Sequence, residues 1–218
     1  MVILQWLIVS VGAYFVGSIP FAYLLAKRYG IDVRRVGSRN VGARNVFDVT
    51  RRLDLAIVVG ILDAAKGAIA VAGSLMLFPD QCHLAAGALF FAVTGHNYPV
   101  WLHFHGGRGL ATAAGGFLVF HPLPIVFFLL MWLTGYFVIR RNVHVGNVAG
   151  ALGTPILLWS APPFYVDLLR TTDCVPSSLL VLITTVVCLQ IFIRHLEPIR
   201  AIFRQGQHDD TTDSGSTD

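Results

Sequence analysis

The sequence predicts an all-α polytopic membrane protein with about seven transmembrane helices. Hydrophobic residues make up 55% of the 218 residues and charged residues only 13%, whereas soluble domains carry about 25% charged residues. The mean hydropathy is +0.67. The apolar residues form continuous runs without alternation, and such runs favour spanning helices over the strands of a β-barrel.

The first half of the chain contains three apolar runs of spanning length. Val2–Leu25 has no charged residue and lacks the basic start of a secretory signal peptide. Leu55–Phe78 contains only Asp63 and Lys66, and Leu84–Leu102 contains no charge. Each run is long enough to cross the hydrocarbon core as one helix.

A longer run, Leu110–Ile139, is interrupted by His121-Pro122-Leu123-Pro124. Proline removes a backbone donor and disfavours helix in the preceding residue. We therefore predict two short helices, 110–120 and 123–139, joined by a turn. The alternative is one kinked helix, which would reduce the count to six. Two further spans are predicted at 145–159 and 177–193.

The basic residues predict the orientation of these spans. Fourteen of the sixteen Lys and Arg residues fall on one side when the spans alternate. Because basic loops stay cytoplasmic, the N-terminus is expected outside and the C-terminus inside. The segment 27–52 and the loop at 106–109 then face the cytoplasm.

We expect residues 1–204 to form a single integral membrane domain. Residues 205–218 are polar and acidic, which predicts a disordered cytoplasmic tail. Cys82 and Cys174 both fall in predicted outer loops and could pair, although loop cysteines are more often free thiols, so the sequence leaves their pairing open. Cys188 lies within a span as a packing residue. No metal-ligand spacing is present, so no metal and no cofactor are predicted.

Two glycine-rich polar loops carry the functional signal. One covers residues 37–45, and the other covers 95–99 and 104–112. Glycine lets backbone N–H groups approach a ligand, and Arg, Ser, Thr and Asn add donors without negative charge. Such loops favour phosphate, and phosphate binding at a membrane edge indicates lipid chemistry. No nucleic-acid partner is expected.

Six short motifs occur in order along most of the chain: Gly17-Ser18-Ile19-Pro20, Gly37-Ser38-x-Asn40-x-Gly42-Ala43-x-Asn45, Leu62-Asp63-x-x-Lys66-Gly67, Gly95-His96-x-x-Pro99, Gly106-Gly107-Arg108-Gly109-x-Ala111-Thr112 and Arg194-His195. In this the chain resembles the bacterial acyl-phosphate glycerol-3-phosphate acyltransferase family (PlsY). The resemblance implies seven helices in the bacterial plasma (cell inner) membrane, with the motif loops cytoplasmic.

The resemblance also implies a reaction and its partners. An acyl chain passes from acyl phosphate to the 1-hydroxyl of glycerol 3-phosphate, giving lysophosphatidic acid and phosphate in phospholipid biosynthesis. Acyl phosphate, glycerol 3-phosphate and membrane lipids are the expected partners, and the enzyme that makes acyl phosphate is a candidate. Because the donor is a mixed anhydride with a good leaving group, the catalyst can work by positioning and oxyanion stabilisation.

Site residues follow from matching the motifs. Ser38, Arg108, His195 and His96 are the catalytic candidates. Arg108 stands where the family has lysine and suits bidentate phosphate binding; His195 belongs to the glycerol 3-phosphate side, and His96 either acts in catalysis or fixes its loop. The acyl-phosphate site would comprise Ser38, Asn40, Gly42, Asn45, Gly106, Gly107 and Thr112.

Asp63 and Lys66 share a helix face inside a span, so we expect a supporting ion pair. Three residues depart from the family's first loop: Arg39 replaces a glycine, Arg44 a threonine and Asp48 an arginine. Either Arg44 reaches the acceptor phosphate with Asp48 orienting it, or the two neutralise each other. Pro198 replaces an asparagine, and Asn147 is a candidate substitute in the stretch 142–150.

Two other functions compete with acyl transfer. A transporter of a phosphorylated solute fits intramembrane charges and broken helices, but it predicts matched halves that the sequence lacks. A catalytically impaired relative that binds acyl phosphate fits the altered acceptor motif.

Overall fold

The computed structural model describes residues 1–139, 141–169, 171 and 174–213, with side chains up to residue 201, and these residues form helices and loops without a β-strand. The elements are α1 (Val2–Gly17), α2 (Phe21–Lys27), α3 (Ala43–Thr50), α4 (Leu53–Leu77), α5 (Cys82–Asn97), the 3₁₀ turn η1 (Val100–Leu102), α6 (Leu110–Phe120), α7 (Leu123–Thr134), the π-turn η2 (Gly135–Ile139), α8 (Val143–Ser160), α9 (Pro163–Leu168) and α10 (Ser177–Asp213).

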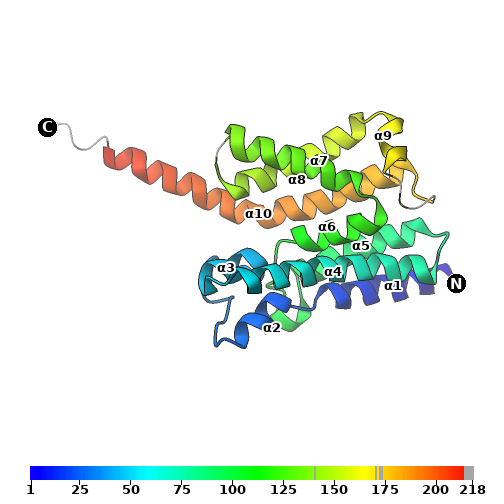
Figure 1. Ribbon diagram of the computed structural model, residues 1–218, viewed down its shortest axis with the longest axis horizontal. Helices are drawn as coiled ribbons and strands as arrows, with labels where there is room; N and C mark the ends of the chain where they lie inside the picture. Colours follow the sequence, from blue (N-terminus) through cyan, green and yellow to red (C-terminus); the bar gives the residue numbers. More distant parts are fainter. Residues whose placement is uncertain (140, 170, 172–173, 214–218) are drawn as a thin grey trace.

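The long helices run side by side in two groups (Figure 1). In one group α1 packs on α5 and α4 packs on α5 and α6; in the other α8 packs on α7 and α10. Three segments of the described chain are long and apolar enough to cross a membrane: Val2–Lys27, Leu53–Leu77 and Ser177–Ala201. Apolar side chains such as Met76 and Ile156 are 82% and 68% exposed, as expected where lipid replaces water.

The predicted break in the run 110–139 is confirmed. Helix α6 ends at Phe120, His121 is extended, and α7 begins at Leu123, which excludes one kinked helix. The Leu123 N–H donates to His121 Nδ1 over 3.3 Å, so the proton is on Nε2, which donates to Val166 O over 2.9 Å. The buried imidazole thus supplies an acceptor for the Leu123 N–H at the start of α7 and a donor for the carbonyl of Val166 in α9.

Small residues let α4 and α6 approach closely. A Cβ on Gly115 would overlap the carbonyl of Ala64, and one on Gly67 would overlap that of Thr112. Interfaces of this kind replace the hydrophobic driving force that is missing between helices in lipid. The contact fixes the start of α6 relative to α4, and both contribute residues to the site described below.

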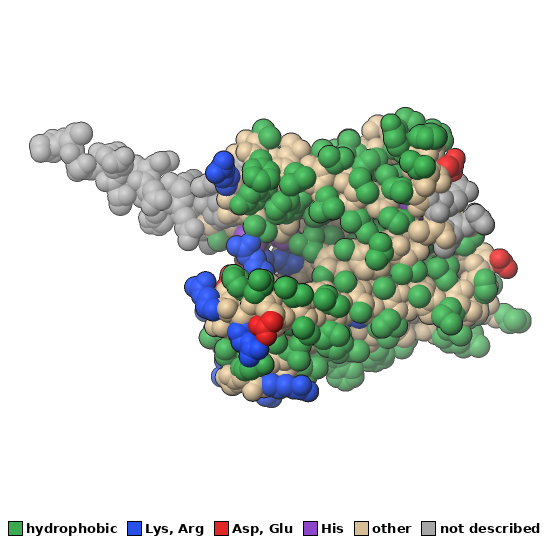
Figure 2. Space-filling view, in the orientation of Figure 1, with side chains coloured by type: hydrophobic (Ala, Val, Ile, Leu, Met, Phe, Trp, Pro, Cys, Tyr) green, Lys and Arg blue, Asp and Glu red, His purple; other side chains and the backbone are tan. Residues whose placement is uncertain are grey.

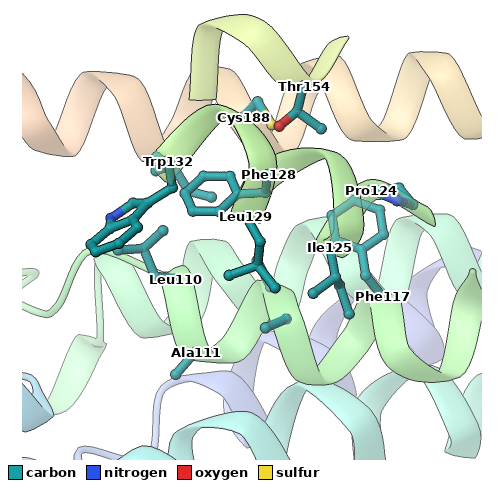
Figure 3. Close-up of a pocket in the computed structure, with 13 residues that line it drawn as sticks. Leu110, Ala111, Phe117, Pro124, Ile125, Phe128, Leu129, Trp132, Thr154 and Cys188 are labelled. Carbon is teal, nitrogen blue, oxygen red and sulfur yellow. The ribbon is translucent and has the colours of Figure 1, made fainter. Parts of the chain in front are cut away.

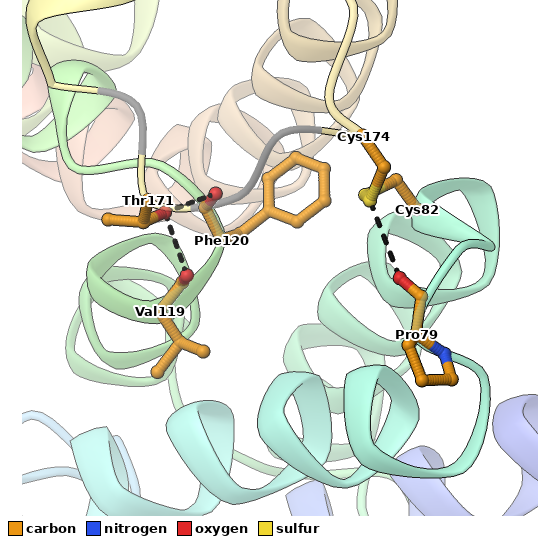
Figure 4. The surroundings of a disulfide bond; sticks show 6 residues. All are labelled: Pro79, Cys82, Val119, Phe120, Thr171 and Cys174. Carbon is orange, nitrogen blue, oxygen red and sulfur yellow. Dashed lines mark hydrogen bonds between the residues drawn. A yellow bond between two sulfur atoms is a disulfide. The ribbon is translucent and has the colours of Figure 1, made fainter.

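A disulfide joins Cys82 at the start of α5 to Cys174 before α10 (Figure 4). The sequence left this pairing open with free thiols as the commoner case, and the fold decides it by bringing the two Cα atoms to 5.7 Å, within the range that a disulfide needs. Pro79 O lies 3.6 Å from Cys174 Sγ, a contact rather than a hydrogen bond, since a disulfide sulfur carries no proton. The bond ties the two helix groups together.

Helix α10 continues to Asp213 and so extends into the segment predicted to be disordered from residue 205. Extending an existing helix needs no new nucleation, which favours continuation even through a polar sequence. The rest of that segment, residues 214–218, lies outside the described residues.

Candidate functional site

Three neighbouring hollows share lining residues, and the central one lies near the starts of α3, α6 and α8. The central cavity has a volume of about 180 Å³. It shares Leu110 and Ala111 with an apolar groove of about 380 Å³. It shares Asn40 and Arg108 with a basic pocket of about 560 Å³. The central cavity therefore joins a site for apolar chains to a site for anions.

The apolar groove runs between α6 and α7, which are antiparallel. Figure 3 shows Trp132 near Leu110 at one end and Pro124 and Ile125 near Phe117 at the other. Apart from the hydroxyl of Thr154 and the thiol of Cys188, its described side chains are almost wholly hydrocarbon. Such a groove stabilises an alkyl chain by removing it from water and matching its shape.

The basic pocket lies at the end of the molecule that carries α2 and α3. Figure 2 shows Lys and Arg side chains gathered there around a hollow in which histidine is also visible. Its charged lining consists of Arg34, Arg35, Arg39, Arg108, Arg194 and Glu197. Such an excess of positive charge favours a phosphate.

Within the basic pocket, Arg34 and Arg108 differ in how far their charges are compensated. Arg34 is neutralised by Asp32, which accepts from Nε over 2.9 Å and from Nη2 over 2.8 Å. Burial, and then the neighbouring Arg194, lower the pKa of Arg108 to about 10, and Glu197 only partly opposes this. A bound anion would relieve the repulsion between Arg108 and Arg194.

Asn45 organises the first glycine-rich loop. Its buried side chain accepts from Ser38 N over 2.9 Å and donates to Val33 O over 2.9 Å and to Val36 O over 3.3 Å. Because these backbone groups occupy its amide, Asn45 stabilises the loop and is not available to a ligand. Ser38 is exposed on the basic pocket, and Gly42 precedes α3 at the central cavity.

The second glycine-rich loop is held between Arg194 and His96. Arg194 Nε and Nη2 donate to Gly107 O over 2.9 Å and to Gly106 O over 3.0 Å. Below the loop, Gly107 N donates to His96 O over 3.0 Å, and a Cβ on Gly107 would overlap the His96 imidazole. Arg194 belongs to the last motif, but nothing in the sequence pairs it with a loop 87 residues away, so the sequence alone does not identify it as a site residue.

The starts of α3 and α6 both open on the central cavity, through Gly42 and Arg44 and through Gly109 to Ala111. Helix N-termini present unpaired N–H groups and a partial positive charge. Gly109 has φ +82°, where a side chain would be strained. Thr112, by contrast, is fully buried against α4 and lines none of the three hollows.

The predicted ion pair between Asp63 and Lys66 is present. Lys66 Nζ lies 2.9 Å from Asp63 Oδ1, both side chains are buried, and Nζ also donates to Ile19 O over 3.1 Å. His96 Nδ1 lies 3.6 Å from the same carboxylate oxygen. Asp63 and His96 also line the central cavity, so the pair supports the ring on which the second loop rests.

His195 reaches the central cavity from α10 and is fixed by Asn147 and Trp132. Trp132 Nε1 donates to Asn147 Oδ1 over 2.9 Å, so the Asn147 amide nitrogen faces His195 Nε2 at 3.0 Å. His195 Nδ1 lies 2.8 Å from Ile191 O, which can only accept. The arrangement assigns a neutral ring with its proton on Nδ1. Nothing in the sequence indicates that the indole of Trp132 takes part in this network.

Arg44 and Asp48 form the pair that their spacing predicts. Arg44 Nε lies 3.7 Å from Asp48 Oδ2, with side chains 57% and 43% exposed. An exposed pair of this kind contributes little to stability. Arg44 also lines the central cavity, whereas Asp48 does not.

The predicted site residues therefore fall into two places and a supporting layer. Asn45 and Thr112 are buried beneath the loops, and Gly107 rests on His96. Ser38 and Gly106 line the basic pocket, which shares Asn40 and Arg108 with the central cavity. Lys66 is buried beside Asp63 and lines none of the three hollows. The other predicted residues line the central cavity: Gly42, Arg44, Asp63, His96 and His195.

The apolar helices are typical of a membrane protein. An apolar groove and a basic pocket that flank one cavity are typical of a protein that binds anionic amphiphiles. The sequence matches the family described as Glycerol-3-phosphate acyltransferase over residues 7–205. The chain belongs to this family. A glycerol-3-phosphate acyltransferase of Desulforamulus reducens is 40% identical over 163 residues, covering 74% of this chain and 78% of the relative. One from Agrobacterium fabrum is 40% identical over 159 residues, covering 72% and 76%.

Two solved structures share the fold. They are crystal structures of PlsY, an integral membrane glycerol 3-phosphate acyltransferase, in a glycerol 3-phosphate form and a lysophosphatidic acid form. The first is 30% identical with a TM-score of 0.74, and the second is 28% identical with a TM-score of 0.73. Each comparison covers 92% of both chains. The resemblance inferred from the motifs is thereby confirmed at the level of the family.

Proposed function

We propose that this protein transfers an acyl chain from acyl phosphate to the 1-hydroxyl of glycerol 3-phosphate. The observation that carries the proposal is the central cavity, which opens on the apolar groove through Leu110 and Ala111 and on the basic pocket through Asn40 and Arg108. A donor with a long chain and an acceptor with a phosphate both fit this arrangement. Membership in the family supports the same reaction.

The transfer needs no acyl-enzyme. The described residues that line the central cavity include no Ser, Thr or Cys. The hydroxyl oxygen bonds to the acyl carbon, the anhydride C–O bond breaks, and the released phosphate takes up the hydroxyl proton. Arg108 and the N–H groups at the start of α6 stabilise the charge on the acyl carbonyl oxygen and the leaving phosphate.

An assay of the purified protein tests the reaction. We expect lysophosphatidic acid and phosphate in equal amounts from acyl phosphate and glycerol 3-phosphate, and no product from acyl-CoA, because the sequence contains no evident adenine-nucleotide or thioester-activating motif. Equal turnover with acyl-CoA would refute the donor. Binding of acyl phosphate without transfer would instead identify a catalytically impaired relative.

We also propose seven spans, with the N-terminus outside and the glycine-rich loops facing the cytoplasm of a bacterial cell. Support comes from the arginine-rich end near α2 and α3 and the disulfide at the opposite end (Figures 1 and 2), since disulfides persist in oxidising compartments. In a Cys82→Ser, Cys174→Ser, Cys188→Ala background, Asp80→Cys should react with an impermeant thiol reagent in intact cells and Arg28→Cys should not. The reverse pattern would overturn the orientation.

A further inference from the structure

Arg39 combines an unfavourable backbone conformation with an unpaired charge. Its φ is +57°, in the left-handed region that side chains with a Cβ rarely adopt. Glycine adopts this conformation without strain because it has no Cβ. The chain nevertheless has arginine at this position. A residue held in this region is a reason to look for a function that requires its side chain.

The side chain of Arg39 lines the basic pocket with Arg108 and Arg194. Among the side chains described up to residue 201, Arg34, Arg35 and Arg44 have carboxylate partners, whereas Arg39 has no ion pair. Arg194 is committed to the carbonyls of the second loop. Arg39 is thus a cation in this pocket whose guanidinium is free to bind a ligand.

The chemistry of the two substrates decides which phosphate Arg39 faces. In acyl phosphate the phosphate is attached to the reacting carbonyl, so it must lie in the central cavity beside the apolar groove. In glycerol 3-phosphate the glycerol backbone separates the phosphate from the reacting hydroxyl. That phosphate therefore lies farther from the groove, and the basic pocket shares no lining residue with the groove.

We propose that Arg39 binds the phosphate of glycerol 3-phosphate and is a determinant of acceptor specificity, at the expense of backbone strain. This inference rests on the proposed function for the identity of the acceptor. The strain and the lost charge predict opposite effects of one substitution. Replacing Arg39 by glycine should stabilise the protein and at the same time weaken acceptor binding.

The test compares the full-length protein with the Arg39→Gly, Arg39→Asn and Arg39→Lys variants. We expect Arg39→Gly and Arg39→Asn to raise the KM for glycerol 3-phosphate by about 10- to 100-fold, with the KM for acyl phosphate unchanged. Asparagine tolerates the left-handed region, so it removes the charge without the added freedom of glycine. Arg39→Lys keeps the charge and should stay within about 3-fold of the parent.

Arg51→Gly is the matched control for strain. Arg51 also has φ +57°, ends α3 and lines neither the central cavity nor the basic pocket. Both glycine variants should raise the melting temperature by about 2–4 °C, but only Arg39→Gly should change the KM. An unchanged KM for glycerol 3-phosphate in Arg39→Gly would overturn the proposal, and so would a rise confined to acyl phosphate.

A binding measurement separates this inference from the proposed function. Calorimetric titration with glycerol 3-phosphate and with inorganic phosphate needs no turnover. If the parent protein transfers no acyl chain but binds glycerol 3-phosphate and loses that binding in Arg39→Gly, the reaction is wrong and the Arg39 site stands. If the parent is active and binding survives the substitution, the Arg39 site is wrong and the reaction stands.

Discussion

Asn147 on α8 donates an amide N–H to Nε2 of His195 on α10 across 3.0 Å. Trp132 holds the other end of the amide, so the donor cannot be exchanged for the acceptor without breaking a second hydrogen bond. The ring is therefore presented to the central cavity neutral and in one tautomer, with its only lone pair directed at Asn147. In this state His195 has no free lone pair, so proton transfer to its ring would first require release by Asn147.

Replacing Asn147 by aspartate should charge this histidine. A carboxylate only accepts, and Ile191 O already accepts from Nδ1, so both ring nitrogens must then carry protons. We expect imidazolium signals for His195 in ¹⁵N NMR at neutral pH. Turnover should fall by about 10-fold or more at pH 7 and recover as the pH rises. Asn142→Asp is the control, because Asn142 caps the same helix by accepting from His144 N. Neutral-ring signals in Asn147→Asp would contradict the assignment.

Lysine should not be able to replace Arg194, which donates two hydrogen bonds to the carbonyls of Gly106 and Gly107. Lysine keeps the charge but cannot donate two parallel N–H bonds. We expect Arg194→Lys to lower kcat/KM by about 10- to 100-fold, the value of one lost charge-assisted hydrogen bond. Arg200→Lys, exposed on the same helix, should leave kinetics unchanged. Equal kinetics for the two variants would remove Arg194 from the site.

A methyl group on Gly107 should displace either the loop or the ring beneath it. The new Cβ would overlap the buried imidazole of His96, which is confined by Asp63. We expect Gly107→Ala to lower both the melting temperature and kcat. Gly73→Ala is the matched control, since nothing lies within 4 Å of its new Cβ and alanine stabilises a helix interior by up to about 1 kcal/mol. A normal melting temperature for Gly107→Ala would show that the loop has room to adjust.

The parts of the fold that the sequence predicts are those set by local properties. The apolar runs, the turn at His121 and Pro122, and the ion pair of Asp63 and Lys66 each depend on neighbours in sequence. Because a proline acts on adjacent residues and a three-residue spacing fixes a helix face, no tertiary information is required.

The features of the fold and the site that the sequence does not predict depend on contacts between distant segments. The disulfide spans 92 residues, and Trp132 reaches His195 only through Asn147. Asn45 looks like a ligand in a polar motif, but the fold directs its amide to Ser38, Val33 and Val36. A motif therefore locates a site, and the packing decides which of its members face the ligand.

Arg44 and Asp48 provide the sharpest test of the central cavity. The sequence left two arrangements open: Arg44 binds the acceptor phosphate with Asp48 orienting it, or the two residues neutralise each other. Arg44 lines the central cavity but not the basic pocket, so we expect an anion-binding Arg44 to face the phosphate of the donor in place of the acceptor phosphate. Arg44→Ala should raise the KM for acyl phosphate by about 10-fold or more and leave that for glycerol 3-phosphate within about 3-fold. Asp48→Ala is the control that breaks the ion pair and keeps the cation, and it should change neither KM by more than about 3-fold. A mild Arg44→Ala together with a more active Asp48→Arg would establish the neutralised pair instead.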